Sequence, residues 1–217
     1  MKTKILQMGA DNFGAGGRSV IAYNLTRPLT NDFQVDFLAI GKLKNPSFHR
    51  IIEENGGHVQ HVKEVSSKIK RLRSIYSILK KEKYDIVHIN ADDAIEGLFN
   101  IILSKLSGAK IVLHAHTTSS SRGEGFIGRL KMLSAKKIVN FLVDYKLACS
   151  LEAADYLYGD TDLSDVAIIK NGIIINDFLY NEELRQNVRE NLNIPMEAIV
   201  LGTIGRMSYE KNPEFMV

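Results

Sequence analysis

"YDIVHINADDAIEGLFNIILSKLSGAKIVLHAH", residues 84–116, contains one complete strand–helix–strand unit and decides the fold class. The short runs 84–90 and 109–116 are rich in Val, Ile and Leu, as the buried strands of a parallel sheet are. The segment between them, 93–108, has the longer apolar pattern of a helix. A strand, a helix and a second strand joined by short turns form a right-handed βαβ unit. The stretch therefore predicts an α/β fold built on a parallel sheet.

The same alternation runs through most of the chain. It predicts further strands at 4–8, 33–41, 58–62, 145–150 and 165–172, and further helices at 16–29, 46–57, 66–84, 126–143 and 151–159. We therefore expect a Rossmann-like, doubly wound parallel sheet over residues 1–175. The polar, mostly helical residues 176–197 are predicted to connect two domains. Residues 198–217 are predicted to hold the first strand and the start of a helix of a second, truncated domain.

Composition narrows the class of protein. The net charge of +3 is too small to indicate nucleic-acid binding by itself. The single cysteine, Cys149, has no internal disulfide partner. No apolar run approaches the ~18 residues that a membrane-spanning helix needs, and the N-terminal apolar stretch is too short for a signal peptide. These features predict a cytoplasmic location.

Polar residues gather where the strand 109–116 ends, in "VLHAHTTSSSRG", residues 112–123. Alternate residues of a strand share a face, so His114 and His116 are expected to point the same way. Imidazole and the hydroxyls of Thr117 and Thr118 are suitable hydrogen-bonding groups for a polyhydroxylated ligand. The alternative is that His114 is a core histidine with satisfied nitrogens. His88, inside the strand 84–90, is expected in the sheet interior.

A second candidate site is the glycine-rich stretch "GADNFGAGGRS", residues 9–19. Gly14, Gly16 and Gly17 would let the backbone approach a ligand at a helix N-terminus. The spacing is not the G-x-G-x-x-G of dinucleotide-binding proteins, and the strand 33–41 does not end in an acidic residue suited to a ribose. The alternative is a tight turn without a ligand.

Charged residues offer three further candidates. "DTD", residues 160–162, is interpreted as a solvated turn, and Asp92 and Asp93 as helix caps. No Cys/His cluster has zinc spacing. In "GRMSYEKN", residues 205–212, Arg206 and Lys211 would converge on a diphosphate. The helices 66–84 and 126–143 are basic and amphipathic, which suits either a solvated face or contact with an anionic membrane.

Taken in order, "GAGGRSV", "YDIVHIN", "IVLHAHTTSSS", "YKLACSLEAADYLYG", "IIKNGI" and "GRMSYEKN" resemble glycosyltransferase family 4, the retaining GT-B sugar-nucleotide transferases. The chain is most similar to the N-terminal part of capsular and exopolysaccharide glycosyltransferases. The family's second acidic motif, E-x7-E, is expected further along the chain than residue 217. The resemblance implies two Rossmann-like domains, with the acceptor bound by the N-terminal one and the nucleotide sugar by the C-terminal one.

The resemblance also implies roles for single residues. His116 would be the catalytic residue and contact the transferred sugar in its neutral form. Arg206 and Lys211 would bind the donor diphosphate. The remaining substrate-binding residues would be Gly16, Gly17, Asn90, His114, Thr117 and Thr118. The expected partners are a nucleotide sugar and a glycan or lipid-linked acceptor, with peripheral contact to an anionic membrane and without nucleic acid, metal or other cofactor.

Two other readings stay open at this point. One is an NAD-dependent oxidoreductase or a sugar-nucleotide-modifying enzyme on the same fold class. The other is an inactive fragment that binds an acceptor or a partner subunit, since the truncated chain is expected to show no turnover by itself.

Overall fold

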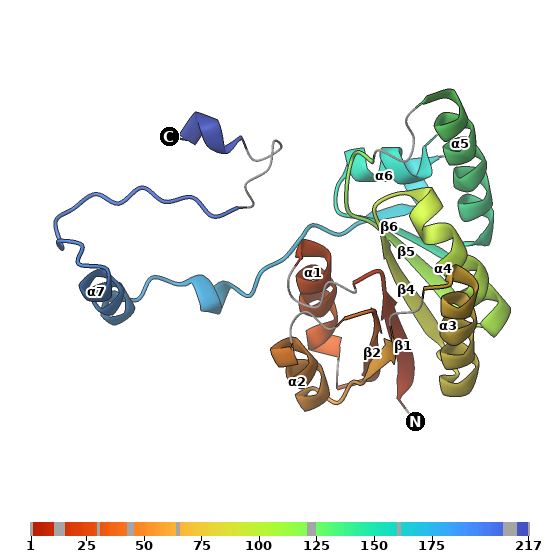
Figure 1. The fold of residues 1–217 in the computed structure, drawn as a ribbon, viewed down its shortest axis with the longest axis horizontal. Coiled ribbons are helices and arrows are strands. Elements are labelled where there is room, and N and C mark those ends of the chain that lie inside the picture. Colours follow the sequence, from red (N-terminus) through yellow and green to blue (C-terminus); the bar gives the residue numbers. More distant parts are fainter. Residues whose placement is uncertain are drawn as a thin grey trace. The chain divides into compact units, whose positions relative to one another are not determined.

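The computed structural model describes residues 2–10, 16–29, 31–42, 46–63, 66–120, 125–159, 162–205 and 212–216. The chain divides into two compact units, Met1–Ile173 and Ile174–Val217. The first unit is built on a seven-stranded sheet in the order β3-β2-β1-β4-β5-β6-β7 (Figure 1). Every neighbouring pair of strands is parallel. The predicted Rossmann-like parallel sheet is thereby confirmed.

The elements follow the predicted alternation of strands and helices. The strands are β1 (Thr3–Met8), β2 (Phe33–Ile40), β3 (Val59–Val62), β4 (Ile86–Ala91), β5 (Lys110–Ala115), β6 (Tyr145–Ala148) and β7 (Val166–Ile168). The α-helices are α1 (Gly17–Thr26), α2 (Pro46–Glu54), α3 (Lys68–Glu82), α4 (Ala94–Ser107), α5 (Gly125–Leu142), α6 (Leu151–Tyr158) and α7 (Glu182–Asn191). The strand predicted at 165–172 is shorter than expected, because β6 pairs only with its first residues.

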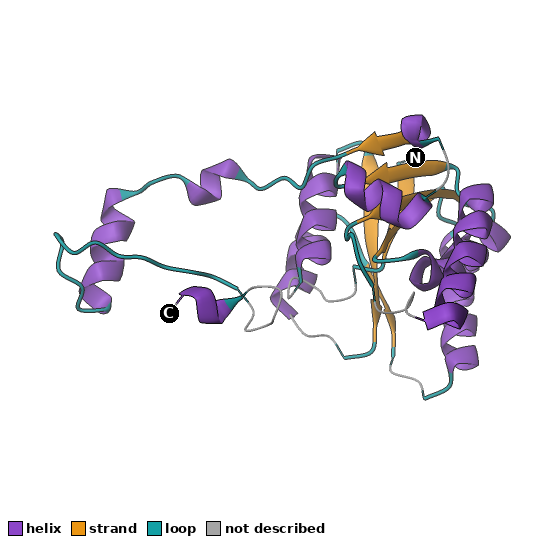
Figure 2. Cartoon of the chain, turned by 90° about the horizontal axis from the view of Figure 1, so that it is seen from above, coloured by secondary structure: helices purple, strands orange, loops and turns teal. Residues whose placement is uncertain are grey.

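Helices cover both faces of the sheet, as Figures 1 and 2 show. Side chains at alternate positions of each strand point to opposite faces of the sheet. Leu6 and Leu38 belong to the core under α3, α4, α5 and α6. Ile5 and Phe37, one residue away on the same strands, belong to the core under α1 and α2. This doubly covered sheet explains why the strand sequences are apolar without interruption.

The strand order reverses between β1 and β4. From β1 the chain winds outward through β2 and β3, then returns to place β4 on the other side of β1. In open parallel sheets a crevice for ligands forms at this point, outside the carboxyl ends of the strands. Of the sequence-predicted histidines, His114 lies in β5, the neighbour of β4, and His116 follows directly after this strand.

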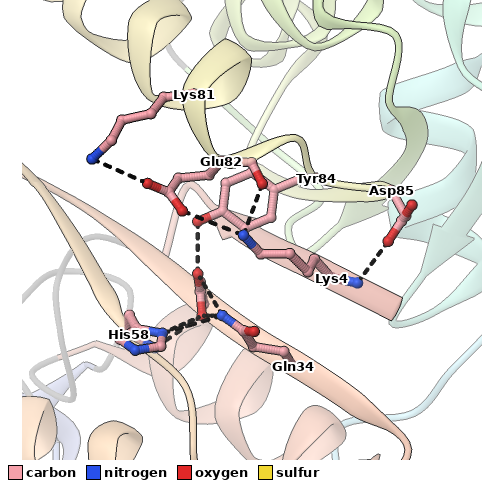
Figure 3. Close-up of polar contacts among 8 residues, drawn as sticks. Lys4, Gln34, His58, Lys81, Glu82, Tyr84 and Asp85 are labelled. Atoms are coloured by element: carbon pink, nitrogen blue, oxygen red, sulfur yellow. Dashed lines mark hydrogen bonds and ion pairs between the residues drawn. The ribbon is translucent and has the colours of Figure 1, made fainter. Parts of the chain in front are cut away.

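Near the amino ends of the strands, three residues surround the buried Asp36 carboxylate, and we call the four residues Gln34, Asp36, His58 and Tyr84 the Asp36 cluster. Figure 3 labels Gln34, His58 and Tyr84 around this carboxylate. Asp36 has no exposed surface. Its carboxylate accepts hydrogen bonds from the Tyr84 hydroxyl at 2.7 Å, the His58 backbone amide at 2.9 Å and the Gln34 amide at 3.1 Å. Burial and the bond to Asp36 raise the pKa of Tyr84 far above its ordinary value, so the phenol keeps its proton. Both oxygens of the buried Asp36 carboxylate are therefore paired.

The second unit contains helix α7, and residues 198–205 are irregular and exposed. Residues 198–204 were predicted to begin a strand, and the structure forms none there. A strand needs a neighbour for its backbone hydrogen bonds, and the described residues of this unit provide no such neighbour. The domain limits at 175 and 197 stay predictions. Along the described part of the chain, no helix combines the length and apolarity needed to cross a membrane.

Candidate functional site

Three imidazoles form a stack at the carboxyl ends of β4 and β5, and we call His88, His114 and His116 the histidine stack. The rings of His88 and His114 lie 5.5 Å apart at 12°, and those of His114 and His116 lie 4.1 Å apart at 35°. The expectation that His114 and His116 point the same way is confirmed by this contact. His88 is only 8% exposed, as predicted for a residue of the sheet interior.

The side-chain amides of Gln7 and Asn90 lie next to the histidine stack, and we call these two residues the amide relay. Their hydrogen bonds determine which ring nitrogen of His88 and of His116 carries the proton. The Asn90 Nδ2 group donates to the Met8 carbonyl at 3.1 Å and to Gln7 Oε1 at 2.9 Å. A backbone carbonyl only accepts hydrogen bonds, so the orientation of the Asn90 amide is settled by Met8. Asn90 Oδ1 must then face His116 Nε2, which lies 2.8 Å away. Because that oxygen only accepts, His116 carries its proton on Nε2.

The same reasoning fixes His88. The Gln7 carbonyl oxygen is used by Asn90, so the Gln7 Nε2 group points to His88 Nδ1 at 2.9 Å. Gln7 donates this bond, and His88 Nδ1 accepts it with its lone pair. The proton of a neutral His88 therefore sits on Nε2.

Burial keeps the whole stack neutral. It lowers the pKa of His116 to about 3, with smaller contributions from His114, His88 and Arg18. It also lowers the pKa of His114 to about 4 and that of His88 to about 3. At pH 7 all three imidazoles are uncharged, and His116 has too low a pKa to remove a proton from an alcohol.

The interpretation of His114 as a satisfied core histidine is wrong in one respect. His114 is buried, with no exposed surface, but both of its ring nitrogens lack a partner among the described residues. His88 Nε2 and His116 Nδ1 are likewise buried without a partner there. Leaving a buried polar group unpaired typically costs about 1–3 kcal/mol, so such groups concentrate where function requires them.

The predicted substrate-binding residues take different positions. Asn90 is 1% exposed and its amide already has three protein partners, and His114 is covered completely. Thr117 is half-buried and its hydroxyl donates to the Ser119 carbonyl at 3.3 Å, whereas Thr118 is exposed. Contacts of these residues with a substrate stay predictions.

The glycine-rich stretch leads directly into α1. Gly16 is the N-cap of this helix and Gly17 its first residue. A Cβ atom added to Gly17 would meet no atom of the described residues within 4 Å. Gly14 lies outside the described residues. The N-terminus of α1 has backbone amides suited to an anion or a hydroxyl.

Sequence reasoning missed two residues that hold this region together. Gly9, directly after β1, has φ +72°, and a Cβ there would lie 1.9 Å from the Asn90 carbonyl oxygen. The Arg18 guanidinium donates to that same carbonyl at 3.4 Å and to Glu96 at 3.2 Å, and pairs with Asp92 at 3.5 Å. A glycine immediately after the first strand was the available signal for the close approach.

Of the two acidic residues predicted to cap a helix after β4, Asp93 does so, whereas the Asp92 carboxylate pairs with Arg18. Asp93 is the N-cap of α4 and accepts from the Glu96 amide at 2.8 Å. Its second oxygen accepts from the Ser120 hydroxyl at 2.6 Å, which ties the loop after β5 to α4. Asp162 caps a short 3₁₀ turn by accepting from Ser164, in agreement with a solvated turn.

Other candidates fall outside the described residues. These are Arg206 and Lys211, Ser121, Arg122 and Gly123 of the loop after β5, and Asp160 of the "DTD" stretch. Within the part of the chain that is described, no group of three or more His, Cys, Asp or Glu side chains is arranged to hold a metal ion.

Comparison with known proteins gives a consistent picture. A putative glycosyltransferase of Bacillus subtilis (strain 168), EpsF, is 23% identical over 210 residues, which are 93% of this chain and 54% of the relative. An Escherichia coli UDP-Gal:α-D-GlcNAc-diphosphoundecaprenol α-1,3-galactosyltransferase is 27% identical over 157 residues, which are 67% of this chain and 38% of the relative. The chain therefore spans about half the length, or less, of these curated relatives.

Solved structures share the fold. HepE from Anabaena, crystallised with UDP and glucose, superposes with a TM-score of 0.65 at 16% identity, over 88% of this chain and 50% of HepE. A glycosyltransferase from Rickettsia africae gives a TM-score of 0.63 at 17% identity, over 90% of this chain and 51% of that one. The family model Glycosyltransferase Family 4 matches residues 15–177, well over half of the sequence. The chain belongs to Glycosyltransferase Family 4.

Proposed function

We propose that the protein that carries this chain transfers a sugar from a nucleotide sugar to a glycan or lipid-linked acceptor, with retention of configuration. Family membership supports the reaction type. The donor and acceptor classes are supported by the name of the Escherichia coli relative, a UDP-Gal:α-D-GlcNAc-diphosphoundecaprenol α-1,3-galactosyltransferase. Within this proposal the unit Met1–Ile173 forms the acceptor side of the site.

The observation that carries the proposal is the neutral His116 at the carboxyl edge of the sheet. Its Nε2–H group donates to Asn90 Oδ1 at 2.8 Å, so the lone pair on Nδ1, which has no partner among the described residues, is free to accept. A sugar hydroxyl that donates a hydrogen bond to Nδ1 would be bound without placing a charge beside the anomeric carbon. Asn90 and His114, both buried, would act through His116 by orienting and packing its ring.

The low pKa of His116 shapes the mechanism. The bond between the anomeric carbon and the diphosphate oxygen breaks, and the acceptor hydroxyl attacks the same face of the sugar. Because His116, with a pKa of about 3, is not a base near neutral pH, the hydroxyl proton passes to the departing phosphate oxygen. Backbone amides at Gly16 and Gly17 are placed to bind the developing negative charge. Arg206 and Lys211 are proposed to bind the donor diphosphate, and the reaction is proposed to need no metal.

The amphipathic helices suit a lipid-linked acceptor at a membrane surface. Helix α5 exposes Phe126, Ile127 and Leu130, which are 84%, 67% and 58% exposed. The basic residues Arg129, Lys131 and Lys137 are exposed on the same helix. A cation near an anionic bilayer contributes about 1 kcal/mol to binding. We include peripheral membrane contact and a role in capsular or exopolysaccharide synthesis in the proposal.

The test uses the complete protein expressed from its gene, a panel of UDP-sugars and a lipid-diphosphate acceptor. We expect transfer that persists in EDTA, with an anomeric configuration of the product, read by NMR, equal to that of the donor. His116→Ala should lower kcat/KM by about 100-fold or more, as the loss of one hydrogen-bonding group at the transition state does. His49→Ala, on α2, is the matched control and should leave the rate unchanged.

Three outcomes would contradict the proposal. They are full activity of His116→Ala, inversion of configuration, and tight NAD binding with no response to any nucleotide sugar. The 217-residue chain by itself is expected to give no transfer, and turnover by it would contradict the division of the site between two units.

A further inference from the structure

A pocket of about 450 Å³ lies beside the loop that follows β5, separate from the histidine stack. Its walls come from one residue of that loop, five residues of α5 and one residue of α6. The lining residues are Ser120, Gly125, Arg129, Met132, Leu133, Lys136 and Tyr156. We call this space the α5 pocket.

The α5 pocket combines positive charge with an apolar wall. Arg129 and Lys136 stand one above the other on α5, and within the described residues neither pairs with a carboxylate. The Lys136 ammonium lies 5.6 Å from the centre of the Tyr156 ring, which holds it over the pocket. Met132 and Leu133 provide apolar surface between the two cations. Such a lining suits a ligand with an anionic head and an apolar chain.

The pocket is joined to the proposed site by direct contacts. The Tyr156 hydroxyl donates to the Ser120 carbonyl at 3.5 Å, and the Ser120 hydroxyl donates to Asp93 at 2.6 Å. Asp93 caps α4 immediately after β4, the strand that carries Asn90. A head group held in the pocket would therefore lie next to the carboxyl edge of the sheet.

An apolar stripe leads out of the pocket. Residues three and four positions apart lie on one side of a helix. Phe126, Ile127, Leu130 and Leu133 form such a stripe, and Leu133 also lines the pocket. Lys131 projects from the opposite flank of the helix and does not line the pocket.

We propose that the α5 pocket binds the diphosphate of an isoprenoid-diphosphate acceptor, with Arg129 and Lys136 on the diphosphate and the stripe of α5 against the first isoprenoid units. This inference rests on the proposed function for the acceptor class, and it assigns the place where that acceptor is held. Charge-assisted contacts to a diphosphate account for the cations, and the apolar chain accounts for the exposed phenylalanine and aliphatic side chains.

The test is binding of farnesyl diphosphate, a water-soluble isoprenoid diphosphate, measured by calorimetry on the 217-residue chain. Each charge-assisted hydrogen bond contributes enough for a change of about tenfold in affinity. The double variant Arg129→Gln/Lys136→Gln should therefore bind at least roughly tenfold more weakly. The control Lys131→Gln/Lys137→Gln removes two charges from exposed positions of the same helix that do not line the pocket, and it should bind within about twofold of the unmodified chain.

Measurements with farnesol, inorganic diphosphate and vesicles distinguish binding of the complete ligand from binding of its apolar half, of its diphosphate or of a bilayer. Farnesol and inorganic diphosphate should each bind more weakly than farnesyl diphosphate, because each lacks one half of the ligand. Binding to vesicles of phosphatidylcholine with phosphatidylglycerol should weaken equally in the double variant and in Lys131→Gln/Lys137→Gln, because each loses two cations. Equal farnesyl diphosphate affinity in the double variant and the unmodified chain would overturn the proposal. So would a loss confined to the vesicles, which would assign Arg129 and Lys136 to the bilayer.

The binding test is distinct from the transfer assay. If the complete protein transfers no sugar while farnesyl diphosphate binding depends on Arg129 and Lys136, the proposed function fails and the pocket assignment stands. If transfer depends on His116 while the double variant binds and uses the acceptor normally, the pocket assignment fails alone.

Discussion

The two ends of the sheet differ in how their buried polar side chains are hydrogen-bonded. In the amino-terminal half, Asp36 is completely buried and both of its carboxylate oxygens accept hydrogen bonds. At the carboxyl edge, the histidine stack leaves four ring nitrogens buried without a partner among the described residues. Both regions join strands that are distant in sequence, so both contribute to the fold. Of these two regions as described, only the carboxyl edge has buried nitrogen atoms without a hydrogen-bond partner.

This difference predicts that the two regions have opposite effects on the stability of the folded chain. A paired buried group stabilises the position of its strands, and its loss is costly. An unpaired buried imidazole costs free energy in the folded state, and acid adds to that cost. The comparison leads to three predictions for the unmodified chain and its variants.

The largest effect is expected at Asp36. Asp36→Ala removes the acceptor of the Tyr84 hydroxyl and of the His58 amide together, so we expect a loss of about 3–5 kcal/mol in the free energy of unfolding. Urea denaturation measures it. Asp32→Ala, at an exposed position before β2, is the control and should change stability by less than about 0.5 kcal/mol. Similar values for the two variants would show that the cluster does not hold the strands.

The second prediction concerns the stability of the unmodified chain at acidic pH. The pKa values of the stack, about 3 for His88 and His116 and about 4 for His114, lie below the value of 6.5 expected in the unfolded chain. Between these values the unfolded chain binds more protons, so stability falls as the pH falls. From pH 7 to pH 5.5 each imidazole should cost roughly 1 kcal/mol.

A variant isolates this contribution. His114→Leu removes one titrating ring and two unpaired nitrogens, so its stability should depend less steeply on pH below 6.5. At pH 5.5 it should be at least as stable as the unmodified chain. An unchanged slope in urea denaturation across this pH range would mean that the stack is solvated, and the contrast with the Asp36 cluster would disappear.

The smallest effect is expected at Gln7, whose amide links His88 to Asn90. Long-range ¹H–¹⁵N spectra of the imidazoles should show His88 and His116 as Nε2–H tautomers. Gln7→Met removes the donor to His88 Nδ1 and should free the tautomer of His88, at a cost of roughly 1–2 kcal/mol. His116 should keep its tautomer, because Met8 still orients Asn90. Observation of an Nδ1–H form of His116 in the unmodified chain would refute the relay.

The fold was predictable because its signals are local. Apolar runs bounded by polar turns identify buried strands, and the period-two pattern places His114 and His116 on one face. The irregular stretch 198–205 was not predictable in this way. Its residues have the composition of a strand, but a strand also requires a partner, and composition does not reveal whether one is present.

The site was only partly predictable because its contacts are distant in sequence. Gln7 and His88 are 81 residues apart, and their bond depends on β4 becoming the neighbour of β1. The same holds for Arg18 and Asn90, 72 residues apart. Asn90 was expected at the site, but its connection to Gln7 and Met8 follows from the strand order alone.

The Met8 carbonyl has a consequence for how this site can change over evolutionary time. It is a main-chain atom, so no substitution alters its polarity, and any amide at position 90 will turn the same way. Mutation can replace the ring at position 116 or the amide that holds it. The direction of the hydrogen bonds from His116 to Asn90 is set by a backbone carbonyl, so substitution of side chains does not reverse it.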